Sequence, residues 1–179
     1  AINGLGGRAV GISGIDGALI RGKVRDSELG YAGTVVKVDT APLEVLLRSG
    51  YIPVVAPASL NDKPGGAPAI LNMNADVVAG EIAAAIGAER LIFLTDVAGI
   101  CDQSGRLLPQ LSAGEAEALM ASGVISGGMI PKVEACLKAL ATTSTASIID
   151  GRQQHALLRE IEGRGVGTRI EATGQKHRE

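Results

Sequence analysis

The stretch Arg90-Leu91-Ile92-Phe93-Leu94-Thr95 is a short apolar run that ends on a small polar residue. A continuous apolar run of this length predicts a strand that is buried on both faces of a sheet. Three further runs have the same character, at residues 8–13, 51–56 and 146–149. Strands of this kind belong to parallel sheets that helices cover on both sides, so the four runs predict the α/β class with a mainly parallel sheet.

Helical segments alternate with these strands, as parallel connections require. The alanine-rich segment 75–86 stops at Gly87. Segment 112–122 opens on Ser112 with Glu115 three residues later, which is a capping box. Three more helices are predicted at 42–49, 129–140 and 155–161.

The segments between these elements are shorter. Residues 18–21 and 34–38 predict a β-hairpin, 61–68 a loop or hairpin tip, and 167–170 a last strand. Residues 1–7 resemble the end of a helix that runs into a glycine stop, which suggests a fragment, and 171–179 form a polar tail. No repeat and no long linker is present, so we expect one domain.

Composition excludes several classes of protein. The net charge is -2 and aromatic residues make up only 2% of the chain, so the basic surface and stacking rings of nucleic-acid binding are missing. Cys101 and Cys136 form no CxxC or Cys/His cluster, so we expect two reduced thiols, no zinc site and a cytoplasmic protein. No apolar run reaches membrane-spanning length, and no membrane partner is predicted.

Three short polar side chains lie two residues apart before the helix at 75–86. They are Asn72, Asn74 and Asp76. On an extended segment this spacing places them on one side, and asparagine offers both a donor and an acceptor to an amide-bearing substrate. The alternative is that Asn74 only caps the helix, although a cap needs one such residue rather than three.

A second polar segment follows the run at 90–95. Thr95-Asp96-Val97-Ala98-Gly99-Ile100 brings a hydroxyl, an acid and a glycine to a strand end, where open α/β sheets bind ligands. This composition suits the sugar and base of a nucleotide. An ordinary turn between strand and helix explains the same residues equally well.

The segment Ser126-Gly127-Gly128-Met129-Ile130-Pro131-Lys132 is the most specific. Its glycines leave the N-terminus of the helix at 129–140 open, and N–H groups at such an end form an anion site. A lysine in the first turn is unfavourable for the helix dipole by a few tenths of a kcal/mol, and a bound phosphate would reverse that effect. The alternative is a solvated lysine.

Other candidates are weaker. The glycines in 11–17 resemble a dinucleotide-binding loop only loosely, because no helix follows them directly. His155 begins a short helix and His177 lies in the tail, so neither is predicted to be catalytic.

Several stretches, taken in order, resemble the motifs of one family. They are 71–76 (LNMNAD), 94–100 (LTDVAGI), 123–133 (GVISGGMIPKV), 149–152 (IDGR), 155–158 (HALL) and 165–168 (GVGT). Together they resemble the N-acetylglutamate kinases of the amino acid kinase superfamily, from Ala1 to about Ile170. The resemblance implies a three-layer αβα sandwich, with 1–70 as the rest of the substrate-binding half and 71–170 as the ATP-binding half.

The resemblance also implies an activity. ATP, accompanied by Mg²⁺ held mostly by phosphate oxygens, would phosphorylate the side-chain carboxylate of N-acetyl-L-glutamate to N-acetylglutamyl 5-phosphate, in arginine biosynthesis. No prosthetic group and no protein metal ligand are implied. Such chemistry depends on positioning and positive charge rather than on a covalent intermediate.

Roles carry over onto matching positions only. Lys132 would stabilise the transferring phosphoryl group, Asp76 would organise the catalytic lysines, and Asn72 with Asn74 would hold N-acetylglutamate. The residues that would border the nucleotide are Thr95, Asp96, Val97, Gly99, Ile100, Cys101, Val124, Ile125, Ser126, Gly127, Gly128 and Met129.

The chain also departs from the family pattern. The first strand with its lysine and glycine-rich loop, the second glycine pair and the arginine that grips the substrate have no match here. We therefore expect little or no kinase activity from this chain alone. Arginine inhibition stays open, because the stretch 160–165 is one residue short and Ser147 stands where sensitive members carry histidine.

Partners and alternatives stay open in the same way. A homo-oligomer and a nitrogen-signalling regulator protein are candidate partners. The alternatives to the main prediction are a related kinase of aspartate, glutamate, carbamate or uridylate, and a non-catalytic nucleotide-binding or regulatory module. The pair Asn72 and Asn74 favours the main prediction.

Overall fold

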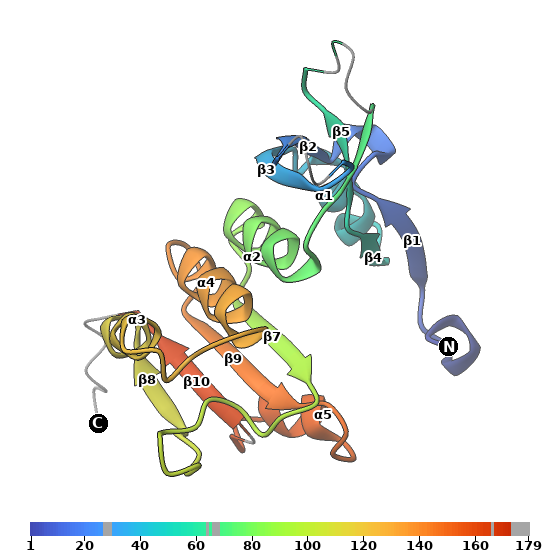
Figure 1. Cartoon of the computed structure of the whole chain (residues 1–179). Coiled ribbons are helices and arrows are strands. Elements are labelled where there is room, and N and C mark those ends of the chain that lie inside the picture. The colour runs from blue at the N-terminus through green and yellow to red at the C-terminus, as the bar shows by residue number, and fades with distance from the viewer. Residues whose placement is uncertain (27–29, 64, 66–68, 166, 173–179) are drawn as a thin grey trace. The chain divides into compact units, whose positions relative to one another are not determined.

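The structure is a computed structural model that describes residues 1–26, 30–63, 65, 69–165 and 167–172. The chain divides into two compact units, Ala1–Ile86 and Gly87–Glu179. Figure 1 shows the course of the chain from the first unit, in blue and green, to the second, in yellow and red. Each unit has its own sheets and helices.

The second unit contains a four-stranded sheet. Its strands are β7 (Arg90–Thr95), β8 (Gln110–Ser112), β9 (Thr145–Asp150) and β10 (Gly167–Glu171), in the order β7-β9-β10-β8. β7 runs parallel to β9, and β8 runs parallel to β10, but β9 and β10 are antiparallel. The sheet is therefore mixed, and the carboxyl ends of β7 and β9 lie at one edge.

Helices cover both faces of this sheet. α4 (Met129–Ala139) packs on β7 and β9, and α3 (Ala113–Ala121) packs on β8 and β10. The short α5 (Ala156–Ile161) contacts β9 and lies on the opposite face (Figure 1). The second unit thus has the three layers expected from the sequence. Its central strand is the best buried part, since residues 146–149 are all less than 5% exposed.

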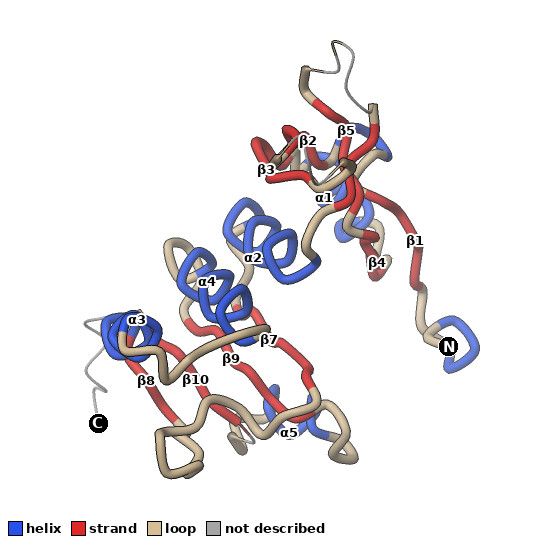
Figure 2. Tube along the Cα trace, in the orientation of Figure 1, coloured by secondary structure: helices blue, strands red, loops and turns tan. Residues whose placement is uncertain are grey.

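The first unit contains two sheets. β1 (Ala9–Ser13) and β4 (Ile52–Ala56) form a parallel pair. β2 (Ile20–Val24), β3 (Gly33–Val38), β5 (Ala58–Asn61) and β6 (Ile70–Asn72) form a mixed sheet in the order β3-β2-β5-β6. The helices are α1 (Ala41–Arg48) against β4 and α2 (Ala75–Ile86) against β3, and Figure 2 distinguishes them from the strands by colour. Two short 3-10 turns occupy Asn3–Leu5 and Asp16–Ala18.

An aliphatic cluster holds the first unit together. Its buried members are Leu19, Ile20, Leu43, Leu71, Met73 and Val78. They come from the mixed sheet, from both helices and from the segments beside them, so this one core ties α1 and α2 to the sheet. No aromatic ring belongs to this cluster, in keeping with an aromatic content of only 2%.

The α/β class, a strand at each of the four apolar runs, the hairpin of β2 with β3 and all five predicted helices are confirmed. Burial on both faces is wrong for the runs at 8–13 and 51–56, because β1 and β4 form a two-stranded sheet in which no residue is fully buried. The capping box is also present, with Ser112 and Glu115 exchanging hydrogen bonds. The antiparallel pairing of β9 with β10 and the strands β5, β6 and β8 were not predicted, because segments of three or four residues carry no readable periodicity. The predicted helix end at 1–7 is a 3-10 turn that stops at left-handed Gly6.

Two predictions fall partly outside the described residues. Residues 64 and 66–68 of the predicted hairpin tip are not described, although β5 and β6 do pair antiparallel on either side of it. His177 and the tail from residue 173 are also not described.

Candidate functional site

The carboxyl ends of β7 and β9 bring two polar segments side by side. Thr95 pairs with Asp150 in the parallel register, and the N–H of Gly151 donates to the Thr95 carbonyl at 2.8 Å. The Thr95 hydroxyl and the Asp96 carboxylate lie 3.3 Å apart. Asp96 is exposed. The predicted sugar-and-base segment therefore sits where parallel strands of an α/β sheet bind ligands.

Asp150 and Arg152 form a pair that was not predicted from the sequence. The guanidinium donates through Nε to Oδ1 at 2.9 Å and through one terminal nitrogen to Oδ2 at 3.0 Å. These hydrogen bonds lower the pKa of Asp150 to about 2, and Asp150 in turn raises the pKa of Arg152. The stretch IDGR contains the signal, because an acid and an arginine two residues apart at a strand end are able to close into such a fork.

The loop after β7 is tied to β10 by one buried hydroxyl. Thr168 Oγ1 accepts from the Ile100 N–H at 2.8 Å and lies 2.7 Å from the Leu108 carbonyl, to which it donates. The Ile100 side chain is buried, and a Cβ at Gly99 would meet Thr168 Oγ1 at 2.7 Å. Gly99 and Ile100 thus fix the loop. Asp96 and Val97 are the exposed residues of this loop among those predicted to border the nucleotide.

The next turn of this loop carries Cys101. Cys101 is half-buried, and its backbone forms an isolated antiparallel β-bridge with Leu107. Within the turn, the Asp102 carboxylate accepts from the side chain and N–H of Ser104 and from Arg106, and these bonds lower the pKa of Asp102. The turn is therefore closed by its own side chains.

The glycine segment before α4 has the open form that the sequence predicts. Ser126, Gly127 and Gly128 are exposed, Val124 and Met129 are half-buried, and Ile125 is buried. The N–H groups of Met129 and Ile130 are occupied by turn hydrogen bonds. Within the described part of the chain, the N–H groups of Gly127 and Gly128 have no acceptor, so they are the ones left for an anion.

Lys132 lies in the first turn of α4 and points back to the sheet. Its Nζ lies 6.0 Å from the centroid of the buried Phe93 ring, at the outer limit of a cation–π contact. Phe93 and Thr95 are two residues apart on β7, so they share one face of the strand. The structure thereby brings Lys132 to the face of β7 that carries Phe93 and Thr95.

Asn72, Asn74 and Asp76 belong to the first unit. Asn72 ends β6 and is exposed, and its N–H donates to the Tyr31 carbonyl. Asn74 Oδ1 accepts from the N–H groups of Asp76 and Val77 at 2.9 and 3.1 Å, so it caps α2. Asp76 is already in the first helical turn, and the extended spacing expected for all three residues holds only for Asn72 and Asn74.

An apolar pocket of about 560 Å³ adjoins Asn72. Tyr31, Ala58, Ala69, Ile70 and Leu71 line the rest of it. A pocket with apolar walls and one amide at its edge is the usual form of a small-molecule site.

Metal ligands do not gather anywhere in the described residues, which contain no group of three or more His, Cys, Asp or Glu side chains placed to hold a metal ion. In the same part of the chain, no helix is both long enough and apolar enough to cross a membrane.

Comparison with known proteins finds that residues 1–150 match the amino acid kinase family. An acetylglutamate kinase of Dehalococcoides mccartyi is 48% identical over 98% of this chain and 64% of its own length. That of Acidiphilium cryptum is 49% identical over 96% of the chain and 61% of its own length. The chain thus spans less than two thirds of these relatives.

Solved structures share the fold. The crystal structure of smu.665 from Streptococcus mutans has a TM-score of 0.78 at 24% identity, over 94% of this chain and 63% of that protein. Carbamate kinase from Giardia lamblia bound to AMP-PNP has a TM-score of 0.64 at 19% identity, over 79% of this chain and 47% of that one. At these identities the likeness concerns the fold alone.

Proposed function

Because this chain belongs to the amino acid kinase family, we propose that it carries the nucleotide site and part of the acceptor site of an N-acetylglutamate kinase. The reaction moves the γ-phosphoryl group of ATP to the side-chain carboxylate of N-acetyl-L-glutamate. A carboxylate oxygen forms the new bond to phosphorus, the bond to the β–γ bridging oxygen breaks, and ADP leaves with that oxygen. Mg²⁺ would enter with ATP on its phosphate oxygens.

The observation that carries this proposal is the position of Lys132. Its ammonium lies beside Phe93 on β7, and Gly127 and Gly128 open the helix start in the same segment. Fixed positive charge and N–H groups stabilise a transferring phosphoryl group without reorganising during the reaction. The ammonium of Lys132 would take this role.

The nucleotide would lie along the strand ends of the second unit. Thr95, Asp96, Val97 and Cys101 present polar or accessible groups to its sugar and base, and Gly99 and Ile100 hold the loop through Thr168. Val124, Ile125, Ser126 and Met129 border the glycine segment on the phosphate side.

The acceptor would use the first unit. Asn72 is exposed beside the apolar pocket, so its amide would hydrogen-bond the acetamido group of the substrate. Asn74 caps α2 and positions Asp76 through its N–H, and Asp76 would orient lysines near the phosphate. The alternative acceptors aspartate, glutamate, carbamate and uridylate contain no acylated amine. The pair Asn72 and Asn74 is therefore the reason to prefer N-acetylglutamate as the substrate. Assignment to arginine biosynthesis and to the cytoplasm follows from this substrate and stays a proposal.

The test measures nucleotide binding and turnover separately. Calorimetry of the 179-residue protein with ATP and Mg²⁺ should give saturable binding, and acyl phosphate formed with N-acetylglutamate is trapped with hydroxylamine. Low turnover by this chain alone remains the prediction. In any protein that contains this chain and shows turnover, Lys132→Ala should lower the rate about 100-fold to 1,000-fold with a smaller loss of ATP affinity.

Lys138→Ala is the matched control, since Lys138 is an exposed lysine near the other end of α4. It should leave the rate unchanged. An unchanged rate in Lys132→Ala would remove Lys132 from the mechanism. In a longer protein that contains this chain, binding of ATP with no phosphorylation of any acylated amino acid would favour the non-catalytic nucleotide-binding module.

A further inference from the structure

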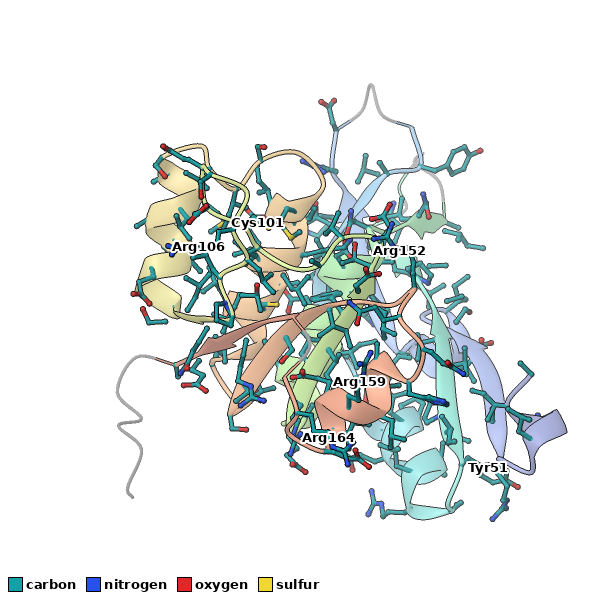
Figure 3. The ribbon with its side chains drawn as sticks, turned by 90° about the horizontal axis from the view of Figure 1, so that it is seen from below. Tyr51, Cys101, Arg106, Arg152, Arg159 and Arg164 are labelled. Carbon is teal, nitrogen blue, oxygen red and sulfur yellow. The ribbon has the colours of Figure 1, made fainter. Side chains whose placement is uncertain are left out.

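Three charged side chains come from the carboxyl ends of β7 and β9, which lie side by side. Asp96 follows β7, Asp150 ends β9, and Arg152 comes two residues later. The pairing of Thr95 with Asp150, together with the Gly151 N–H on the Thr95 carbonyl, joins these ends directly. Figure 3 labels Arg152 at this end of the sheet.

Arg152 is held rigidly on one side and open on the other. Both Asp150 oxygens accept from its guanidinium, and the Arg152 N–H donates to Oδ1 at 3.0 Å. The Asp150 side chain is only 12% exposed, whereas that of Arg152 is 66% exposed. A bidentate fork fixes the plane of the guanidinium, so its remaining N–H groups face solvent in a defined direction.

Asp96 lies within electrostatic reach of that guanidinium. Its charge adds to that of Asp150 in raising the pKa of Arg152. The two carboxylates and one guanidinium sum to a charge of -1, which disfavours direct contact between Arg152 and a polyphosphate. A carboxylate is instead an acceptor for the hydroxyl groups of a ribose.

We propose that Arg152, clamped by Asp150, is a positioning residue that holds Asp96 toward the nucleoside end of the bound nucleotide. The inference rests on the proposed nucleotide site but not on the identity of the phosphate acceptor. It assigns Arg152 to recognition of the sugar and base, through Asp96, and not to the phosphate chain.

The chain offers a closely matched control. Glu162 and Arg164 are also an acid and an arginine two residues apart in the second unit, with 3.2 Å between Nε and Oε2 and a 68% exposed arginine. Both pairs join a carboxylate to a similarly exposed arginine, but Glu162 is 40% exposed against 12% for Asp150, and Glu162 and Arg164 follow α5 rather than a strand end. Arg164→Gln therefore reports the effect of losing an exposed ion pair away from the site.

The experiment measures binding of AMP and of ATP with Mg²⁺ to the complete chain by calorimetry, and the melting temperature of every variant. Arg152→Gln should weaken both nucleotides by the same factor, about tenfold, because the nucleoside is common to both. Arg152→Lys, which keeps the charge but not the fork, should also weaken both. Arg164→Gln should leave both affinities unchanged.

A double-mutant cycle tests the route through Asp96. In an Asp96→Asn background, Arg152→Gln should change either affinity by less than about twofold, because the residue it positions is already altered. A full tenfold loss in that background would overturn the inference. A loss that grows from AMP to ATP would also overturn it, since it would indicate phosphate contact.

Three further outcomes distinguish this inference from the proposed function. A lower melting temperature with unchanged affinities in both Arg152 variants would make the pair purely structural and overturn the inference. Failure of the wild-type chain to bind either nucleotide would overturn both this inference and the proposed function. A longer protein that contains this chain and phosphorylates another acceptor, but not N-acetylglutamate, would overturn only the proposed function, and the cycle would still decide the role of Arg152.

Discussion

β4 in the first unit and β9 in the second each pair in parallel with one neighbouring strand and each contain an apolar run, but helices cover them differently. Ile148 and Ile149 of β9 are fully buried between α4 and α5. Ile52 and Val54 of β4 are 48% and 49% exposed, on the face opposite α1. An apolar run therefore predicts a strand, while the helices that pack on it decide whether both faces are buried.

The comparison has an energetic consequence. A parallel strand is normally stabilised by cover on both faces, and two strands alone are not a stable sheet. β9 has a partner strand on each side and helices on both faces. The second unit should therefore have a larger free energy of unfolding than the first unit.

Separating the units should give the largest effect. Residues 87–179 expressed alone should unfold in one cooperative thermal transition, whereas residues 1–86 alone should unfold over a broad range, because β1 and β4 leave an apolar face in water. Circular dichroism and amide hydrogen exchange measure both. A sharp transition in 1–86 and none in 87–179 would show that the first unit, and not the second, is the more stable one.

Close backbone packing is a feature that both units share. A Cβ at Gly167 would run into the Ile148 carbonyl, and one at Gly14 would run into the Ala58 carbonyl. Since neither oxygen can move without breaking its strand, Gly167→Ala and Gly14→Ala should each lower the free energy of unfolding by about 3 kcal/mol. Denaturant titration measures this. If only Gly167→Ala lowered the free energy of unfolding, the backbone around Gly14 would have room to accept a Cβ.

Thr168 tethers the loop after β7 in the second unit. Thr168→Val should cost about 2 kcal/mol of unfolding free energy, because the Ile100 N–H and the Leu108 carbonyl lose their buried partner. Thr168→Ser keeps the hydroxyl and should restore most of the loss. Equal melting temperatures for the Val variant and the wild type would show that water replaces the hydroxyl.

The fork at the end of β9 makes the second unit sensitive to acid. The hydrogen bonds from Arg152 lower the pKa of Asp150 from 3.8 to about 2. Its contribution to stability is therefore complete above about pH 4 and is lost as the pH falls toward 2. Melting temperatures of wild type and Asp150→Asn should differ by a constant amount at neutral pH and converge between about pH 4 and about pH 2. A constant difference across that whole range would contradict this.

The smallest effect is expected at an open glycine. Gly114 is exposed in the first turn of α3, and no atom lies within 4 Å of a Cβ built there. Gly114→Ala should raise the free energy of unfolding by about 0.5 kcal/mol through helix propensity. It also serves as the control for Gly167→Ala and Gly14→Ala. Destabilisation by this change would mean that α3 has a further neighbour.

Local patterns predicted the elements well because their causes are local. The Ser112 capping box, the stop at Gly87 and the glycines before α4 act within a few residues, and each has the predicted form. The glycines that open α4 also predict correctly that Lys132 lies in its first turn. Asn74 shows the limit, since the same side chain suits a cap and a substrate contact, and the structure shows it as a cap.

The amino-acid order was sufficient to predict the α/β class, the helices, the strands at the four apolar runs and the family motifs, since periodicity, caps and glycine stops depend on neighbours along the chain. Three features required the folded chain: Thr168 binds Ile100, 68 residues away, the pair of Asp150 and Arg152 lies beside the end of β7, and β4 keeps an exposed face. These features depend on strand order and register, which bring together groups whose spacing in the sequence carries no signal.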